Sequence, residues 1–399
     1  MATTTVGPRG DARSQRRAAR LENNASNSSP PPYRAARYVR RGLLWRESSL
    51  PRARKCGRTR HEQQGVGVRY SPGSGAGFSG LVTCGSVWVC PVCNAKIMAR
   101  RAVEVGAAVA LWQAEHGRRV AFATLTMRHR LGQPLTTLWD ALSAAWGAVT
   151  SGKQWVNDRD RYGIAGWLRV VEVTWGEHGW HVHVHALLFL DADVDVASLQ
   201  ARLFGRWSRA LVRRGLAAPL AQGQDVRLLA GPADEALSRY FTKATDDGHR
   251  IGLEVTATQS KTTRDGHGTR TPWSFLDGLE VGDADELDRW HEWERGSHGR
   301  RQMTWSQGFR QRLGLMAEKS DDEVAAEEVG QEEDTLLVIR AEGWDEVCRE
   351  PARLAQILDV TETGGLAALR ALLDGWAVAY DPGWEHSNDR RRSTTRRRP

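Results

Sequence analysis

The chain has 399 residues and a formal net charge of +8. This length predicts two or three domains with a substantial core and excludes a disulfide-stapled mini-protein. No apolar run approaches the roughly 20 residues that span a bilayer, and the N-terminus lacks the apolar stretch of a signal peptide, so we expect a cytoplasmic protein without membrane contact. Arginine is concentrated in blocks, which favours nucleic acid as a partner, although a basic protein with solvated charge runs would have the same composition.

The N-terminal quarter of the chain divides into two parts. Residues 1–50 are rich in Arg, Ser, Asn and Pro without periodicity, and we expect a disordered basic arm. Residues 51–100 form a cysteine segment that contains Cys56, Cys84, Cys90 and Cys93. In a reducing compartment four thiolates favour tetrahedral Zn²⁺ over disulfides, with His61 as an alternative to the first ligand. The CxxC motif in this group also occurs in redox-active proteins, but the additional cysteines favour structural zinc.

The middle of the chain, residues 101–318, alternates between strand-like and helix-like segments and predicts an α+β domain in which helices cover a sheet. Apolar spacing predicts helices at 94–115, 138–149, 196–214 and from about 233 onward. Apolar and β-branched runs predict strands at 120–127, 167–175, 180–190 and 226–229. The second and third strands flank Gly176-Glu177-His178-Gly179, which has the chemistry of a hairpin turn.

The C-terminal part begins with an acidic segment. Residues 319–334 are nearly free of large apolar groups, so we predict a linker. Residues 335–385 have helical apolar spacing, which predicts a small accessory domain. The basic tail at 386–399 contains two arginine triplets and is another candidate contact for a polyanion.

Three alternating histidines are the strongest chemical signal. His181, His183 and His185 project from one face of a strand, and the residues between and after them are apolar. With Glu177 and His178 at the centre of a two-residue turn, the numbers of facing residues sum to 355, and Glu172 then faces His183. The same register sets Thr174 opposite His181.

Imidazole nitrogens beside a carboxylate form an open site that suits Mg²⁺ or Mn²⁺ in nucleotidyl transfer. We therefore predict a divalent metal held by Glu172 and by histidines from the set His181, His183 and His185. The spacing leaves open which two histidines bind, and a purely structural histidine cluster is the alternative.

A tyrosine and a lysine share one face of the next predicted helix. Tyr240 and Lys243 are one turn apart, so a phenol lies beside an ammonium group. A phenolate can attack a phosphodiester to give a covalent 5′-phosphotyrosine, while lysine favours the anion and neutralises phosphate charge. An isolated YxxK is more often a boundary tyrosine of an amphipathic helix, so this hypothesis depends on the histidine strand that precedes it.

Three segments resemble, in this order, the signature motifs of rolling-circle plasmid replication initiators of the HUH endonuclease superfamily: TLT at 124–126, GWHVHVHALLFL and RYFTK. The upstream CGSVWVCPVCNAKI, followed by Arg100 and Arg101, resembles the cysteine motif of the branch found in plasmids of GC-rich Gram-positive bacteria. The resemblance covers about residues 56–315. It implies a central antiparallel sheet flanked by helices in the catalytic domain.

The resemblance also implies an activity. Such an enzyme nicks one strand of a single-stranded or hairpin-borne origin, keeps the 5′ end on tyrosine, leaves a 3′-OH primer and later rejoins the strands. His183 and His185 match the family's histidine pair, His181 lies outside it, and Tyr240 matches the nicking tyrosine. Some members carry a glutamate four residues before the tyrosine, where this chain has Ala236. Glu235 beside it is the candidate for the terminating cleavage, and a host helicase and the replication machinery are expected partners.

Two other functions remain open at this point. A transposase or mobilisation relaxase of the HUH type could use the same metal and tyrosine chemistry on another DNA substrate. The zinc-bearing transposases of this superfamily often carry two tyrosines on the catalytic helix, whereas Tyr240 has no second tyrosine nearby. A non-catalytic, zinc-containing DNA-binding regulator would use the basic arms for phosphate contacts and the histidines for structure.

Overall fold

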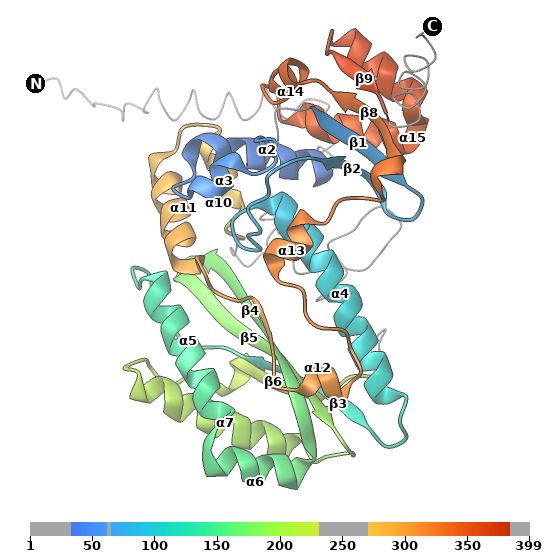
Figure 1. Cartoon of the computed structure of the whole chain (residues 1–399). Helices are drawn as coiled ribbons and strands as arrows, with labels where there is room; N and C mark the ends of the chain where they lie inside the picture. The colour runs from blue at the N-terminus through green and yellow to red at the C-terminus, as the bar shows by residue number, and fades with distance from the viewer. Residues whose placement is uncertain (1–32, 62–64, 231–269, 384–399) are drawn as a thin grey trace, which may run out of the picture.

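Two antiparallel sheets with surrounding helices form the fold (Figure 1). The computed structural model describes residues 33–61, 65–230 and 270–383, and every structural statement below concerns these residues. The five-stranded sheet has the strand order β6-β3-β5-β4-β7, and the four-stranded sheet has the order β2-β1-β8-β9. The α+β class and the central antiparallel sheet with flanking helices are confirmed. In this described part, no helix combines the length and apolar composition needed to cross a bilayer.

The five-stranded sheet is built around the predicted hairpin. Its strands are β3 (Arg119–Leu125), β4 (Ile164–Gly176), β5 (Gly179–Leu190), β6 (Gln224–Leu228) and β7 (Met303–Trp305). The long β5 strand lies in the middle, between β3 and β4. Its alternation gives one apolar face, with Val182, Val184 and Leu188 fully buried, and one face that carries the three histidines.

Helices cover the two faces of this sheet differently. Helices α5 (Leu135–Val149), α6 (Gly152–Tyr162) and α7 (Val196–Arg213) lie together on one side of the sheet, and α4 (Pro91–Gln113) lies on the other (Figure 1). Trp146 of α5 packs edge to face on Trp167, which is on the apolar face. Phe189, on the histidine face, packs edge to face on Trp112 of α4. The far end of the histidine face is therefore covered by α4.

The four-stranded sheet joins distant parts of the chain. Its strands are β1 (Val66–Ser71), β2 (Gly75–Ser79), β8 (Thr335–Ile339) and β9 (Tyr380–Pro382). We predicted a cysteine segment at 51–100 and a separate accessory domain at 335–385, but β1 pairs directly with β8. The two parts share a core because Val66 and Val68 are buried together with Leu337 and Ile339. The structure therefore corrects the expectation that they fold separately.

The remaining helices divide between this second core and the main core, which contains the five-stranded sheet. They are α2 (Tyr33–Glu47), α3 (Pro51–Lys55), α10 (Ser274–Leu279), α11 (Ala284–Ser297), α12 (Phe309–Arg312), α13 (Asp321–Ala326), α14 (Ala341–Val347) and α15 (Ala352–Gly375), with short 3-10 turns at Ala221–Gly223 and Glu332–Asp334. Helices α14 and α15 bury residues in the second core, α2 buries residues in both, and the other helices bury residues in the main core. Helix α15 lies within the region of predicted helical apolar spacing and has a kink at Gly365, where φ is 63°.

The predicted disordered arm is wrong for residues 33–47, which form α2. Leu43 and Leu44 are buried in the main core, and Tyr38 and Trp45 are buried in the second core. The arginines of this helix do not prevent packing because several have acidic partners; Arg34, for example, pairs with Glu362 of α15 at 2.8 Å. Residues 1–32 lie outside the described part of the chain.

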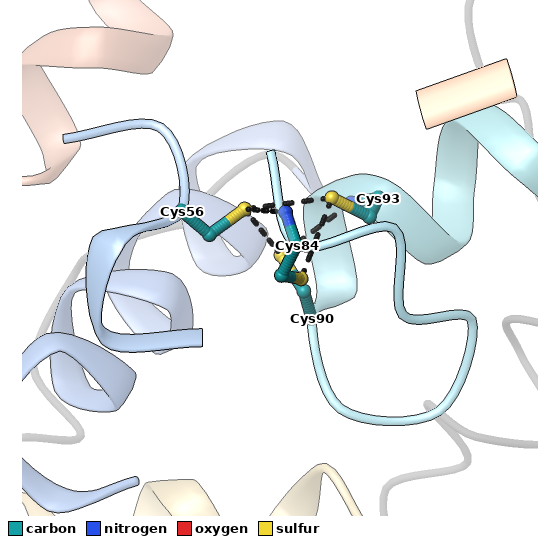
Figure 2. Close-up of side chains that lie close together, drawn as sticks. All are labelled: Cys56, Cys84, Cys90 and Cys93. Carbon is teal, nitrogen blue, oxygen red and sulfur yellow. Dashed lines mark hydrogen bonds between the residues drawn. The ribbon is translucent and has the colours of Figure 1, made fainter. Parts of the chain in front are cut away.

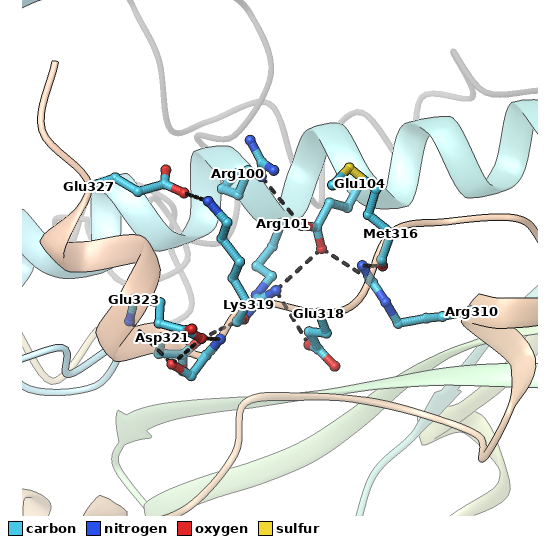
Figure 3. A network of polar contacts seen from close by, with 11 residues as sticks. Arg100, Arg101, Glu104, Arg310, Met316, Glu318, Lys319, Asp321, Glu323 and Glu327 are labelled. Atoms are coloured by element: carbon cyan, nitrogen blue, oxygen red, sulfur yellow. Dashed lines mark hydrogen bonds and ion pairs between the residues drawn. The ribbon is translucent and has the colours of Figure 1, made fainter. Parts of the chain in front are cut away.

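The predicted acidic linker is also wrong, because α13 packs against α4. Val324 and Ala325 are buried, and the Lys96 ammonium donates to the Ala325 carbonyl at 3.1 Å. Figure 3 shows two acidic side chains of this segment directed at Arg101 of α4, whose guanidinium lies 3.0 Å from Asp321 and 3.4 Å from Glu318. The acidic composition that suggested a solvated linker instead serves to pair with a basic helix.

Candidate functional site

The predicted hairpin register is confirmed. Gly176 pairs with Gly179 across the turn, Glu172 with His183, and Thr174 with His181. The two-residue turn fixes this register, since each step along one strand is matched by a step on the other. Glu172 and the histidines consequently share one face of the sheet.

Glu172, His183 and His185 converge on one point. The Nε2 atoms of His183 and His185 lie 2.9 Å and 3.0 Å from the same carboxylate oxygen, Oε2 of Glu172. One ligand atom from each of the three residues lies within 4.8 Å of the others. In an octahedral site with bonds near 2.1 Å, adjacent ligands are about 3 Å apart. The spacing of these donors therefore fits a divalent cation such as Mg²⁺ or Mn²⁺.

The charge state of the three residues also suits a cation. Burial alone would raise the pKa of the Glu172 carboxyl, but the neighbouring His183 and His185 outweigh it and hold the pKa well below its usual range. Burial lowers the pKa of His185 despite the carboxylate beside it. An ionised carboxylate and a neutral imidazole are the forms that bind metal ions.

Thr124 orients one of the imidazoles. The Thr124 hydroxyl lies 3.1 Å from Nδ1 of His185, because β3 pairs with β5 in a register that sets Thr124 opposite His185. A hydroxyl can donate or accept, so it satisfies this nitrogen in either tautomer and leaves Nε2 for the site. Such outer contacts fix the ring orientation of metal-ligating histidines.

His181 packs edge to face on His183, with ring centroids 4.9 Å apart, but it is not one of the three converging residues. It contacts a residue that the sequence motifs did not reveal. His129, just past β3, places its Nε2 atom 3.0 Å from Nδ1 of His181, and its Nδ1 atom donates to the carbonyl oxygen of His178 at 2.9 Å. Burial, with repulsion from His183 and His129, lowers the pKa of His181 to about 3. The signal that could have identified His129 is its position beyond the end of a strand that pairs with the histidine strand.

The four cysteines of the N-terminal segment also meet (Figure 2). The Sγ atom of Cys56 lies 3.7 Å from that of Cys90 and 3.5 Å from that of Cys93, and Cys84 lies 3.7 Å from Cys93. The corners of a zinc–sulfur tetrahedron with 2.3 Å bonds are about 3.8 Å apart, whereas a disulfide needs roughly 2.05 Å. The cluster geometry therefore fits Zn²⁺, and in the described chain the cysteine set comes together without His61.

The cysteine cluster lies where α3 ends and α4 begins. Cys56 is the C-cap of α3, and Cys90 is the N-cap of α4, with Pro91 in the first helical position. Cys93 is in the first turn of α4, so two of the four sulfurs lie at the positive end of a helix dipole, which favours thiolates. A metal at this point would join α3 to α4.

The predicted residues Tyr240, Lys243 and Glu235 lie outside the described residues. The chain on each side of them belongs to the five-stranded sheet. Before residue 231 the chain follows β6, which pairs with β3, and after residue 269 Arg270 forms an antiparallel bridge with Trp175 of β4.

Comparison with known proteins gives two relatives and one family. A family model described as replication protein matches residues 81–195, which contain three of the cysteines and the entire histidine hairpin. The protein rep of Streptomyces lividans is 30% identical over 337 residues, which are 68% of this chain and 73% of that protein. A neomycin resistance protein of Streptomyces cyanogenus is 30% identical over 217 residues, about half of each chain. No solved structure matches.

Proposed function

Because this chain belongs to the family of replication proteins, we propose that it acts as a plasmid replication initiator by nicking one strand of the origin and starting rolling-circle synthesis. The observation that carries this proposal is the convergence of Glu172, His183 and His185 on one point of the sheet. A sheet face with a carboxylate and two imidazoles at ligand spacing supports phosphoryl transfer rather than a purely structural histidine cluster.

The proposed metal is Mg²⁺ or Mn²⁺, held by Glu172, His183 and His185. When bound, such an ion polarises a phosphate oxygen and offsets the negative charge that develops during transfer. In the proposed reaction the phenol oxygen of Tyr240 forms a bond to phosphorus. The bond from phosphorus to the 3′ oxygen breaks, and that oxygen takes up a proton to become the 3′-OH primer.

The position of Tyr240 in the chain is compatible with this role. It follows Ala230 by ten residues, a length that spans at most about 35 Å when extended. The strand before it, β6, is two strands away from β5 in the sheet, a separation of about 10 Å. We propose that Lys243 neutralises phosphate charge and that Glu235 assists the terminating cleavage.

Family membership favours replication over the alternatives from the sequence. A mobilisation relaxase, a transposase and a DNA-binding regulator were each compatible with the motifs, but the relative that covers two thirds of this chain is a protein rep. The proposed partners are origin DNA, in single-stranded or hairpin form, and a host helicase with the replication machinery.

The nicking assay tests this function. Purified protein incubated with supercoiled plasmid that carries the cognate origin and Mn²⁺ is expected to produce nicked circles with protein on the 5′ end. Glu172→Gln removes the negative charge of one ligand, so the Mn²⁺ concentration for half-maximal nicking should rise by on the order of 10- to 100-fold. Loss of a residue that only hydrogen-bonds to a metal ligand already has an effect of this size. Glu177→Gln, an exposed carboxylate at the tip of the same hairpin, is the matched control. Equal metal dependence in the two variants would contradict the site.

We also propose that Cys56, Cys84, Cys90 and Cys93 hold a structural Zn²⁺. Because the free energy of zinc binding contributes to folding, Cys90→Ser is expected to lower the melting temperature by roughly 5–10 °C, given about 2–4 °C per kcal/mol in domains of 150–250 residues. Cys348→Ser is the control, since Cys348 is buried apart from the cluster. Metal analysis should find one zinc per chain in the wild type, and its absence would exclude the proposal.

A further inference from the structure

Arg41 is a buried cation without an acidic partner in the part of the chain that the structure describes. Its side chain extends from α2, the residue is 4% exposed, and its Nε and Nη2 atoms are buried without a hydrogen-bond partner in the described chain. No ion pair found among residues 33–61, 65–230 and 270–383 includes Arg41. Other buried arginines differ in this respect: Arg101 contacts Asp321, and Arg206 contacts Asp158.

The guanidinium of Arg41 lies against the segment that carries Cys56. A Cβ atom on Gly57, the next residue, would lie 2.1 Å from its Nη1 atom, so the group packs directly on this glycine. Burial would lower the pKa of Arg41, but the Tyr38, Cys56, Cys90 and Cys93 side chains outweigh it and raise the pKa. After Tyr38, the groups that favour the cation are three cysteines of the cluster.

The aromatic neighbours do not provide the missing charge. The guanidinium lies over the Tyr38 ring at 4.5 Å and near the Trp45 ring at 5.8 Å, which contributes a cation–π attraction. Burial, however, raises the pKa of Tyr38, so this phenol is neutral. An arginine cannot lose its proton in a protein, and a buried charge without an opposite charge is strongly disfavoured.

We propose that Arg41 is the counter-charge of the cysteine cluster in its zinc-bound form. Four thiolates around one Zn²⁺ carry a net charge of −2, whereas four thiols or two disulfides carry none. The guanidinium offsets half of this charge, and the positive end of α4 contributes to the remainder. Arg41 is thus a positioning residue that stabilises the thiolates, and this inference rests on the proposed zinc site.

Removal of the Arg41 charge is expected to speed zinc release and to change the melting temperature differently in zinc-loaded and metal-free protein. Arg41→Leu should increase the rate at which zinc passes to a chromogenic chelator by on the order of 10- to 100-fold, as for other outer contacts of metal ligands. It should lower the melting temperature of the zinc-loaded protein. In chelator-treated, metal-free protein the same substitution should leave the melting temperature unchanged or raise it, since the buried cation then has no counter-charge.

Arg206→Leu is the matched control, because Arg206 is 5% exposed, pairs with Asp158 and lies on α7, away from the cysteines. It should lower the melting temperature with and without zinc and leave zinc release unchanged. If Arg41→Leu or the metal-free protein does not fold, zinc release is compared between zinc-loaded Arg41→Lys and Arg41→Gln. Release should be at least tenfold faster from the glutamine variant than from the lysine variant.

The outcomes separate the two proposals. Wild-type protein without zinc would refute the zinc site itself. Zinc present at one per chain, but released equally fast from the charged and uncharged Arg41 variants, would overturn the role of Arg41 and leave the zinc site intact. Faster zinc release from the uncharged Arg41 variants alone, with a melting temperature that is unchanged or higher in the metal-free protein, supports the counter-charge.

Discussion

Substitution of His183 by alanine is expected to reduce metal-dependent nicking by about three powers of ten. Metal catalysis contributes several kcal/mol to transition-state stabilisation, and each 1.36 kcal/mol corresponds to a tenfold change in rate. The Nε2 atom of His183 lies 2.9 Å from Glu172, so its removal deprives the site of one ligand and leaves the carboxylate without one of the groups that hold it ionised. The rate of nicking at saturating Mn²⁺ is the measurement.

His178→Ala is the matched control for this substitution. His178 is exposed at the turn of the same hairpin, and its contact to His129 uses the backbone carbonyl, which alanine retains. Both variants should bind duplex DNA like the wild type, since phosphate contacts come from other basic surfaces. A His183→Ala protein that nicks at the wild-type rate would show that the proposed metal site does not participate in cleavage.

Replacing Tyr240 with phenylalanine is expected to have the largest effect, since it removes the proposed nucleophile. Loss of a nucleophile reduces the rate of a covalent enzyme by on the order of 10⁶, which places nicking below detection. The wild type should form a 5′-linked adduct on single-stranded origin DNA that maps to the peptide containing Tyr240, and the variant should form none. Lys243→Ala should slow adduct formation without abolishing it, because lysine tunes charge and forms no bond.

The control for the covalent step is Tyr380→Phe. Tyr380 lies in β9 of the other sheet, where its hydroxyl donates to Asp374 at 3.1 Å, so loss of this hydroxyl should leave adduct formation unchanged. Metal-activated water as the nucleophile would nick DNA without any adduct. An adduct that persists in Tyr240→Phe would place the nucleophile elsewhere in the chain.

The features predicted from the sequence are those that local chemistry determines. The turn at 176–179 sets the hairpin register, and the register alone brings Glu172 to His183. Apolar periodicity located α5 and α7 within a few residues because each buries one continuous stripe. The cysteines could be grouped because ligand type and number already satisfy tetrahedral zinc.

The features that were missed depend on pairing between distant segments. The strands β1 and β8 are short, and neither reveals its partner in the sequence, so the accessory region was separated from the cysteine segment. The acidic run at 319–334 was interpreted without the basic helix α4 that it contacts. His129 belongs to no motif, and its contact to His181 follows only from the pairing of β3 with β5.

The pairing of β1 with β8 also has a consequence for biosynthesis. Arg69 leaves the ribosome 266 residues before its partner Thr335, a delay of roughly 13–50 s at about 5–20 residues per second. The strands of the five-stranded sheet are all synthesised by residue 305, so that sheet can form while one edge of β1 still has unpaired amide and carbonyl groups. A nascent chain that is stalled or truncated before residue 335 therefore retains an open strand edge, which makes it prone to aggregation and a ready substrate for chaperones and proteases.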